Sequence, residues 1–265
     1  MRILCFSDLH IPRWCDYLTR DKRYLDWGGF TKIKPLIDQS KPDVIVATGD
    51  LVDPRDLGIY YEILDNVFGG DIPLITTLGN HEFWGRSFVE TRQLICAATE
   101  DSKHNNIHCL DVCKYHIIDN TLFVGGMLFF DGSMRWRENQ GLYPLNGWND
   151  CHISDLKYGY THVCSDYIQD ISENVALYAE GRNTILCTHH VPHEDINAHE
   201  PSPYSFYSGT KNILKDLKVD PNMNNVSISG HTHKRCVGKQ LENFLCVNVG
   251  KSEDEYDINY FCLEV

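Results

Sequence analysis

The sequence contains no long apolar run and no closely spaced cysteine pair of the kind that binds a structural metal ion. No stretch approaches the ~18 apolar residues of a transmembrane helix, and a strand-like run rather than a signal-peptide core follows Arg2. The 11 cysteines form no C-x-x-C motif, and several lie inside apolar runs, where cysteine behaves as a small hydrophobic residue. We therefore expect reduced thiols, a cytoplasmic protein and no membrane partner.

Basic residues are also scarce, and they form no cluster along the chain. Lysine and arginine number 24 against 37 acidic residues, which gives a formal net charge of −13. This balance disfavours long nucleic acid as a partner, although it does not exclude a small anionic substrate at a metal site. The chain has no internal repeat, low-complexity tract or linker, so we expect residues 1–265 to form one domain. No feature of the sequence indicates an oligomeric state.

Short apolar runs alternate with helical patterns, as an α/β fold requires. The runs predict strands over Ile3–Phe6, Val44–Thr48, Leu74–Leu78, Leu122–Gly125, Thr184–Thr188, Val226–Ser229, Leu245–Val249 and Ile258–Leu263. The apolar spacing predicts helices over Phe30–Gln39, Leu57–Phe68, Ser87–Ala97, Ser165–Ala179 and Lys211–Leu217. Residues 131–163 are rich in aromatics and interrupt this alternation, which is typical of a lid or substrate loop, or of an insertion that covers the edge of a core.

Polar residues with metal-binding side chains follow five of the apolar runs. The fragments are Asp8-Leu9-His10, Gly49-Asp50, Gly79-Asn80-His81-Glu82, His189-His190 and Gly230-His231-Thr232-His233. Residues two apart on an extended segment point to the same side, so Asp8 and His10 can hold one cation together, as can His231 and His233. Gly230 would let the backbone turn sharply there. The carboxyl ends of strands are the favoured edge for active sites in α/β sheets, so these side chains should converge.

The types of side chain in these fragments define the chemistry that they can support. The carboxylate of Asp50 can bridge two cations through its two oxygens, and the neutral amide of Asn80 limits the negative charge where a phosphate must approach. Oxygen and imidazole ligands without thiolates suit Mn, Fe, Zn, Mg or Ni rather than a structural zinc. Each fragment alone is a weak signal. Their occurrence in this order, each after a strand-like run, predicts a site for two divalent metal ions.

In this combination the fragments resemble the calcineurin-like metallophosphoesterases, whose pattern is D-x-H, G-D, G-N-H-[ED], a later His and G-H-x-H. The resemblance extends from Asp8 to His233 and implies a four-layer α/β fold, a β-sandwich of two mixed sheets flanked by helices. It implies that the first ion is bound by Asp8, His10, Asp50 and His233. It further implies that the second ion is bound by Asp50, Asn80, His189 and His231.

The resemblance also implies roles for the neighbouring residues. The first histidine of H-H-x-P is the usual ligand in similar proteins, so His189 is expected to face the metals and His190 to stand behind it. The loop that follows contains His193, His199 and Glu200, which are expected to be solvated, although one of them could touch substrate. His81 is expected to stabilise the transition state or protonate the leaving alkoxide, while a metal-activated hydroxide attacks phosphorus. Glu82 is expected to orient a neighbouring group.

The expected activity is hydrolysis of a small phosphate mono- or diester, such as a nucleotide, with Mn²⁺ as the first choice of metal. Protein serine/threonine phosphatases carry G-D-x-V-D-R-G, whereas Pro54-Arg55-Asp56 follows Asp53 here, which disfavours a phosphoprotein substrate. A non-catalytic protein-binding scaffold of the same fold and a nuclease are the alternatives. Arginines that could clamp a phosphate, or could instead be solvated at the surface, are Arg86, Arg135 and Arg137. Aromatic residues that could stack on a base or aromatic leaving group, or could instead pack in the core or an interface, are Trp14, Trp84, Trp136 and Tyr204.

Overall fold

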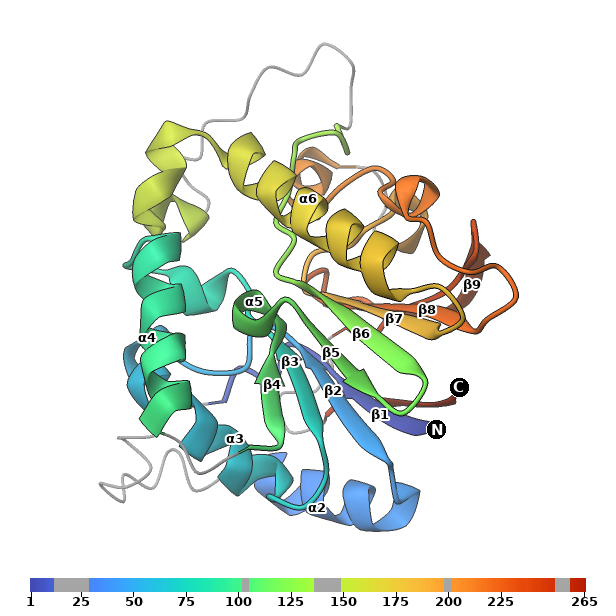
Figure 1. Cartoon of the computed structure of the whole chain (residues 1–265). Coiled ribbons are helices and arrows are strands. Elements are labelled where there is room, and N and C mark those ends of the chain that lie inside the picture. The colour runs from blue at the N-terminus through green and yellow to red at the C-terminus, as the bar shows by residue number, and fades with distance from the viewer. Residues whose placement is uncertain (12–28, 102–104, 136–148, 198–201, 251–257) are drawn as a thin grey trace.

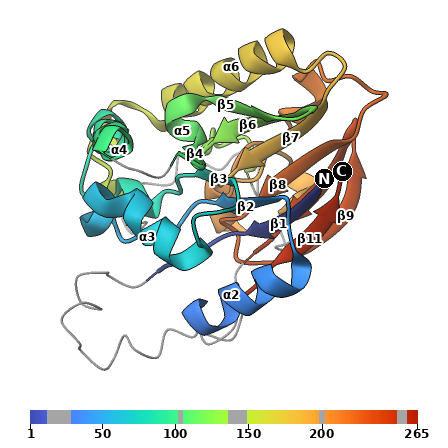
Figure 2. The same cartoon turned by 60° about the horizontal axis from the view of Figure 1, so that its bottom comes forward.

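The computed structural model shows two β-sheets packed face to face, with helices on both outer faces (Figures 1 and 2). It describes residues 1–11, 29–101, 105–135, 149–197, 202–250 and 258–265. In Figure 2, α6 (Tyr160–Tyr178) lies above one sheet, and α2 (Gly29–Ser40) and α3 (Tyr60–Phe68) lie below the other. The expected four-layer sandwich of two mixed sheets is therefore confirmed.

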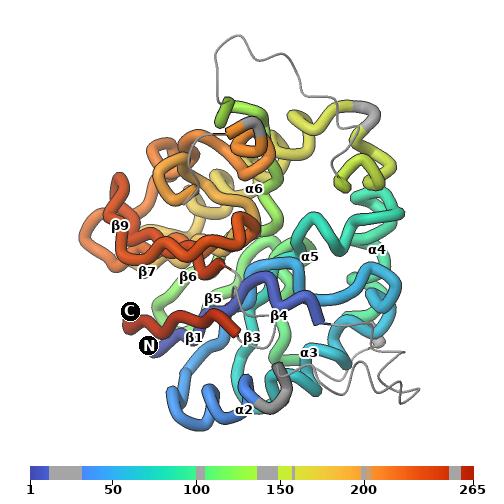
Figure 3. Tube along the Cα trace, turned by 180° about the vertical axis from the view of Figure 1, so that it is seen from behind, coloured from blue at the N-terminus to red at the C-terminus, as the bar shows by residue number. Residues whose placement is uncertain are grey.

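The first sheet has five strands in the order β11-β1-β2-β3-β4. Their bounds are β1 Arg2–Phe6, β2 Val44–Thr48, β3 Leu74–Thr77, β4 Ile107–Cys109 and β11 Phe261–Glu264. Strands β1 to β4 are parallel, and β11 pairs antiparallel with β1. The two chain ends consequently lie side by side, as Figure 3 shows from behind. The parallel pairing brings the carboxyl ends of β1, β2 and β3 to one edge.

The second sheet has six strands in the order β5-β6-β7-β8-β10-β9. Their bounds are β5 Tyr115–Ile118, β6 Thr121–Gly126, β7 Asn183–Thr188, β8 Asn225–Ser229, β9 Cys236–Leu241 and β10 Phe244–Asn248. The four central strands are parallel, while β5 and β9 are antiparallel edge strands. The carboxyl ends of β7 and β8 are therefore neighbours too.

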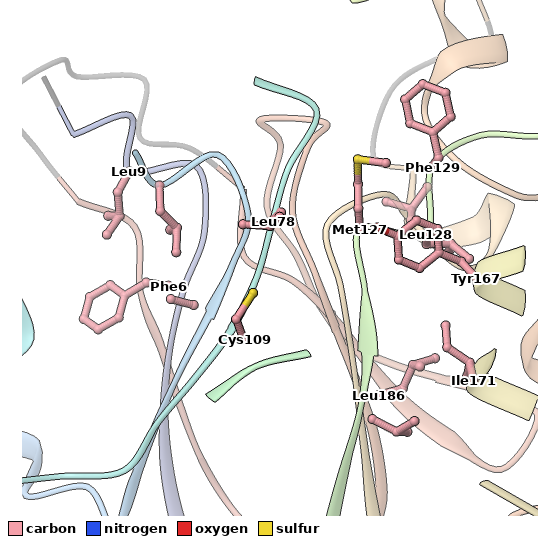
Figure 4. Close-up of a cluster of buried hydrophobic side chains, with 14 of the residues drawn as sticks. Phe6, Leu9, Leu78, Cys109, Met127, Leu128, Phe129, Tyr167, Ile171 and Leu186 are labelled. Atoms are coloured by element: carbon pink, nitrogen blue, oxygen red, sulfur yellow. The ribbon is translucent and has the colours of Figure 1, made fainter. Parts of the chain in front are cut away.

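Side-chain alternation in the strands divides the core into an inner and an outer part. Between the sheets, one buried cluster includes Ile3 and Cys5 of β1 with Ile185 and Cys187 of β7. The alternate residues of these strands, such as Phe6 and Leu186, belong to the cluster that extends under the helices (Figure 4). Because both faces of the central strands are buried, the strands are rich in apolar residues and stand out in the sequence.

Asp111, at the start of the short helix α5 (Leu110–Cys113), connects the two sheets near the site edge. Its carboxylate accepts hydrogen bonds from the backbone N–H of Leu78 after β3 (2.7 Å) and of Met127 after β6 (3.0 Å). The hydroxyl of Tyr167 on α6 donates to the same carboxylate at 2.5 Å. Asp111 is 1% exposed, so these donors satisfy a buried acid while holding the two strand ends together.

The predicted elements agree with the structure over most of the chain, and the differences have physical reasons. The predicted helix over Lys211–Leu217 is wrong: only residues Leu214–Asp216 form a 3-10 turn. Before that turn the backbone bonds to other loops, since Lys211 N–H donates to Ser133 Oγ and the Lys211 carbonyl accepts from Glu194. The predicted helix over Leu57–Phe68 begins as a 3-10 turn and becomes α3 only at Tyr60.

Three strands were absent from the sequence-based prediction. Strand β4 has three residues, β5 is half-buried throughout, and β9 is polar and largely exposed. Helix α6 begins at Tyr160, and so the irregular stretch is shorter than residues 131–163. Residues 136–148 of that stretch lie outside the described part of the chain. Residues 12–28, which precede α2, lie outside it as well. The remaining helix, α4, runs from Phe88 to Asp101. Within the described ranges, no helix combines the length and apolar character needed to cross a bilayer.

Candidate metal centre

All five polar fragments lie directly after parallel strands and meet at the same edge of the sandwich. Asp8 and His10 follow β1, Asp50 follows β2, and Asn80 follows β3 in the first sheet. The other two fragments, with His189, His231 and His233, follow β7 and β8 in the second sheet. The site is therefore built from both sheets, and it lies where their carboxyl ends converge.

One group of side chains consists of Asp8, His10, Asp50 and His233. Each contributes a nitrogen or carboxylate oxygen, and these atoms all lie within 4.8 Å of one another. His10 Nε2 is 3.5 Å from His233 Nε2 and 4.0 Å from Asp50 Oδ2, and His233 Nε2 is 3.5 Å from Asp8 Oδ1. These are the four residues that the resemblance assigns to the first ion, and their spacing could accommodate one cation.

A second group of atoms surrounds His189 Nε2. Asn80 Oδ1 lies 3.1 Å from this nitrogen, His231 Nδ1 lies 3.3 Å from it, and Asp50 Oδ1 lies 3.4 Å from it. Asp8 and Asp50 are 2% exposed, Asn80 is 3% exposed and His189 is fully buried. The four residues that the resemblance assigns to the second ion are thus also brought together.

The outward contacts of this second group leave acceptor atoms facing inward. His189 Nδ1 contacts the carbonyl of Thr48 at 3.0 Å, and His231 Nε2 contacts the carbonyl of Tyr207 at 3.1 Å. Because a carbonyl oxygen can only accept, these nitrogens carry the protons, and the lone pairs of His189 Nε2 and His231 Nδ1 face each other. Acceptors that converge without a donor require a positive charge between them, so this donor set fits a cation.

A proton can supply that positive charge when no metal ion is bound. Burial lowers the pKa of His189, but the carboxylates of Asp50 and Asp8 and the bond to Thr48 raise it to about 10. Burial likewise raises the pKa of Asp50, yet the adjacent histidines, His189 and His81 first, hold it well below its ordinary value. Asp50 is therefore an ionised carboxylate, with Oδ1 toward the second group and Oδ2 toward the first.

The second histidine of the pair, His190, faces away from Asp50. Its ring stacks on His231 with centroids 4.0 Å apart and contacts Phe129 edge to face at 5.2 Å. Its Nδ1 donates to the Met127 carbonyl at 3.3 Å, and its buried Nε2 has no hydrogen-bond partner among the described residues. A nitrogen of His190 still lies within 4.8 Å of those of His189 and His231. The contacts with Asn80 and Asp50 favour His189 as the ligand.

The backbone at the site adopts a conformation that most residues avoid. Positive φ angles occur at the candidate ligands Asp8 (52°), His10 (43°), Asp50 (52°), His231 (66°) and His233 (57°). Such angles cost free energy in non-glycine residues and persist where the surrounding structure enforces them, as at functional sites. Candidate ligands thus make up five of the 11 non-glycine residues with positive φ in the described part of the chain.

Two glycines that precede candidate ligands lie so close to other residues of the site that a side chain would not fit. A Cβ atom on Gly79 would lie 2.1 Å from Asp50 Oδ1, and one on Gly230 would lie 1.7 Å from Ser7 Oγ and 2.5 Å from Asp8 Oδ2. The expected sharp turn is present, since the Thr232 N–H donates to the Gly230 carbonyl at 2.8 Å, but a positive φ at Gly230 is not its cause. The φ of Gly230 is not positive, whereas that of His231 is, and close packing against the first fragment requires the glycine.

Glu82 binds the backbone of two loops that carry candidate ligands, in agreement with its expected orienting role. Its fully buried carboxylate accepts from the backbone N–H groups of Asp50 (3.1 Å), Leu51 (2.6 Å), Val52 (2.9 Å) and Gly79 (2.7 Å). Burial and the charge of Asp50 raise the pKa of Glu82 to about 8, against the opposing effect of these hydrogen bonds. The residue joins the loops after β2 and β3, and its carboxylate faces backbone groups rather than the open site.

His81 occupies the rim of the site beside Asp50. Its Nε2 lies 3.6 Å from Asp50 Oδ2, its backbone N–H donates to Asp50 Oδ1 at 3.0 Å, and its side chain is 32% exposed. The ring stacks on Trp84 with centroids 3.7 Å apart. Burial lowers the pKa of His81 more than Asp50 raises it, which favours the neutral imidazole near pH 7.

Two cavities border this His81–Trp84 pair. The larger, of about 620 Å³, is bounded by Asn80, His231 and His233, and by Tyr204, which is 66% exposed. The smaller, of about 360 Å³, is bounded by His10 and by residues 52–55. Asp50, His81 and Trp84 line both. Two separate spaces therefore adjoin Asp50, His81 and Trp84.

Other candidates from the sequence have different positions. Arg86 donates to the Pro54 carbonyl at 2.6 Å, Arg135 donates to the Gly132 carbonyl at 3.1 Å, and neither is among the described residues that line these cavities. His193 is 9% exposed and caps the turn after it by accepting from Asp195 N–H, so the expectation that it is solvated is wrong. Trp14, Trp136, Arg137, His199 and Glu200 lie outside the described residues.

Sequence reasoning missed one buried residue of the site, Asp150. Its Oδ1 accepts from Asn80 Nδ2 at 2.7 Å and from Trp84 Nε1 at 2.9 Å. It lies 70 residues from Asn80 in an irregular segment and belongs to none of the five fragments. A lone aspartate between an asparagine and a cysteine carries no signal by which its position could have been recognised.

The chain belongs to the calcineurin-like phosphoesterase family, because the family model matches residues 1–235. The protein is similar in structure to a phosphopantetheinyl hydrolase from Mycobacterium tuberculosis, with a TM-score of 0.63 and 16% identity over 94% of this chain and 88% of that one. It is also similar to a dimetal phosphatase from Danio rerio, with a TM-score of 0.54 and 12% identity over 99% and 91% of the two chains. At these identities the structural similarity shows the fold alone. No curated protein matches the sequence.

Proposed function

We propose that this protein hydrolyses a small phosphate ester with the help of two divalent cations held at the edge of the sandwich. The observation that carries the proposal is the arrangement around Asp50, whose two carboxylate oxygens face two separate groups of ligand atoms. In the proposed assignment Asp8, His10, Asp50 and His233 hold one cation, and Asp50, Asn80, His189 and His231 hold the other. Cations in these positions would activate water for attack and neutralise phosphoryl oxygens.

The donor set supports a choice among metals. It combines imidazole nitrogens, carboxylates and one amide oxygen, and thiolates are absent from the described groups that could hold an ion. Such a set suits first-row divalent ions and Mg²⁺. We expect Mn²⁺ to restore activity best, and Fe, Zn, Mg and Ni are the ions to compare with it.

His81 is the proposed residue that stabilises the transition-state charge or protonates the leaving oxygen. It stands on the rim beside Asp50 rather than in either group of ligands, so its Nε2 can reach an ester bound over them. Stacking on Trp84 fixes the orientation of the His81 ring. An imidazole can accept and return a proton near neutral pH, which suits it to general acid catalysis.

The cavities favour a diester over a monoester. An ester centred over Asp50 would adjoin both cavities, so both substituents of the phosphate could be bound. No lysine or arginine is among the described lining of the larger cavity, and Arg55 beside the smaller one is paired with Asp53 at 2.6 Å. These surroundings favour an ester with uncharged substituents, including a nucleoside, over a polyphosphate.

The test compares p-nitrophenyl phosphate with bis-p-nitrophenyl phosphate. Metal-stripped protein is titrated with each ion, and the Asp50→Asn variant is measured in parallel. We expect metal-restored turnover with a higher kcat/KM for the diester, and a loss of at least one bound ion in Asp50→Asn. A protein that binds two ions but hydrolyses neither ester would contradict the proposal and favour a binding scaffold.

A further inference from the structure

Asp150 is a buried carboxylate on the wall of the larger cavity, in a turn whose other residues are exposed. It belongs to the 3-10 turn Asn149–His152 and is itself 0% exposed, whereas Asn149, Cys151 and His152 are exposed. Its Oδ1 accepts two side-chain hydrogen bonds, from Asn80 Nδ2 and Trp84 Nε1. A buried acid needs such partners, and here both partners belong to the site.

The first hydrogen bond determines the orientation of the Asn80 amide. Because Nδ2 donates to Asp150 at 2.7 Å, Oδ1 is turned toward His189 Nε2, 3.1 Å away. An amide rotated by 180° would present its N–H₂ group to the ligand cluster, and that group cannot bind a cation. Asp150 therefore selects the orientation of Asn80 that offers an oxygen.

The second hydrogen bond fixes the indole ring beside His81. Trp84 Nε1 donates to Asp150 at 2.9 Å, and the face of the indole stacks on the His81 imidazole at an interplanar angle of 30°. Rotation of the indole would remove the surface on which the imidazole rests. One carboxylate is thus connected to a candidate ligand on one side and to the candidate proton donor on the other.

The backbone around Asp150 is attached to the site by contacts that do not involve its side chain. The backbone N–H of Gly85 donates to the His152 carbonyl at 3.0 Å, and that of Ser154 donates to the Arg86 carbonyl at 3.0 Å. The N–H of Phe88 donates to Asp155 Oδ2 at 2.9 Å, and Ile153 is 1% exposed. A substitution at position 150 should therefore leave this segment in place.

We infer that Asp150 is a positioning residue that holds Asn80 in its cation-binding orientation and, through Trp84, holds His81 over the reacting ester. The inference rests on the proposed function for its catalytic part. The orientation of Asn80 and Trp84 is a property of the folded chain that can be measured without any substrate. Mutation of residues that hydrogen-bond to metal ligands commonly lowers metal affinity or activity by about 10–100-fold.

The test uses Asp150→Ala and Asp150→Asn, with Asp155→Ala as the matched control. Asp155 anchors the same segment through Phe88 but does not contact the ligands in the described structure. We expect Asp150→Ala to weaken binding of one of two Mn²⁺ ions about 10-fold or more, measured calorimetrically without substrate. We expect kcat for bis-p-nitrophenyl phosphate to fall with little change in KM. Asp150→Asn retains an acceptor oxygen, so it should largely restore both values.

A second readout separates the positioning role from the proposed function. The indole N–H of Trp84 gives a proton–nitrogen NMR signal, which Trp84→Phe would assign by its disappearance. That signal should shift in Asp150→Ala and stay in place in Asp155→Ala. Unchanged Mn²⁺ affinity together with an unshifted signal in Asp150→Ala would overturn the inference, as would equal losses in both alanine variants. A wild-type protein without turnover would count against the proposed function, and the Mn²⁺ and NMR results would still decide the role of Asp150.

Discussion

The imidazole of His81 lies nearly parallel to the indole of Trp84, with ring centroids 3.7 Å apart and an interplanar angle of 30°. This contact holds the histidine beside Asp50 without making it part of either group of ligand atoms. Asn80 and His81 are adjacent in the sequence, but their side chains have different surroundings. Asn80 faces the ligand cluster, and in the proposed function His81 would face the substrate.

We predict that His81→Ala lowers kcat by ~10²-fold or more while both metal ions remain bound, because a positioned general acid contributes on this scale. The measurement combines steady-state kinetics with metal analysis of the purified variant. His162, an exposed histidine on α6, provides the control, and His162→Ala should behave as wild type. Wild-type kinetics in His81→Ala would remove this residue from the mechanism.

Gly79→Ala should disrupt the site although it adds only one methyl group. The new Cβ would lie 2.1 Å from Asp50 Oδ1 and 2.4 Å from the Asp50 backbone nitrogen, so Asp50 must move. We expect reduced metal occupancy and a loss of about 1–3 kcal/mol in the free energy of unfolding, as for other overpacked sites. Metal analysis and urea unfolding provide the two measurements.

Gly58→Ala is the matched control for that variant. A Cβ on Gly58 would meet no atom within 4 Å, and its φ is not positive. Its stability should stay within about 0.5 kcal/mol of wild type. Equal effects of the two substitutions would show that the close approach of Gly79 to Asp50 does not matter.

Cation binding should release a proton from His189. The pKa of this residue is raised to about 10 without a metal ion, so at pH 7.5 its imidazole is protonated and must lose that proton to become a ligand. Metal affinity should consequently rise with pH up to about 10. Calorimetry in two buffers of different ionisation enthalpy counts the released protons. A count of zero at pH 7.5 would contradict the assignment of His189.

A pair of stacked histidines far from the site should make the fold sensitive to acid. The rings of His108 on β4 and His116 on β5 lie 3.5 Å apart, and burial together with His116 lowers the pKa of His108 to about 4. The unfolded chain would bind this proton near pH 6.5, before the folded chain does. The contribution to stability is therefore complete above pH 6.5 and declines as the pH falls toward 4.

His108→Gln should remove this contribution to the pH dependence. Urea unfolding at pH 7 and pH 5 would give a smaller difference in stability for the variant than for the wild-type protein. The comparison between the two proteins cancels the other groups that titrate in the same range. Identical pH profiles would mean that His108 titrates alike in the folded and unfolded chains.

Much of the fold could be predicted because the central strands are buried on both faces. The run at β2, Val44–Thr48, is apolar at nearly every position and matches its predicted bounds. The edge strand β9 has no such apolar run. It is stabilised by pairing with β10, and local sequence patterns do not reveal a contact of this kind. The Lys211–Leu217 error has a related cause, since bonds to Ser133 and Glu194 override the local helical pattern.

The candidate ligands could be named from the sequence because each follows a strand within four residues of its end. Their convergence depends only on parallel pairing within each sheet and on the packing of the two sheets. Asp150 lacked such a cue, since the contact with Asn80 spans 70 residues and depends on how one irregular segment docks. The choice between His189 and His190 likewise depends on side-chain direction, which adjacent positions in a sequence do not reveal.

The presence of residues from both sheets in each ligand group has a mechanical consequence. Each group combines side chains from both halves of the sandwich, and the contact between His10 and His233 spans 223 residues of chain. If cations bind as proposed, each one ties the two halves together in the folded chain. Because its ligands separate on unfolding, the cation stabilises the folded state by mass action. A chelator that removes the cations should then lower the stability of the folded chain. Amide hydrogens at the ends of β3 and β8 would exchange faster once it is added, while those at the opposite edge would remain protected.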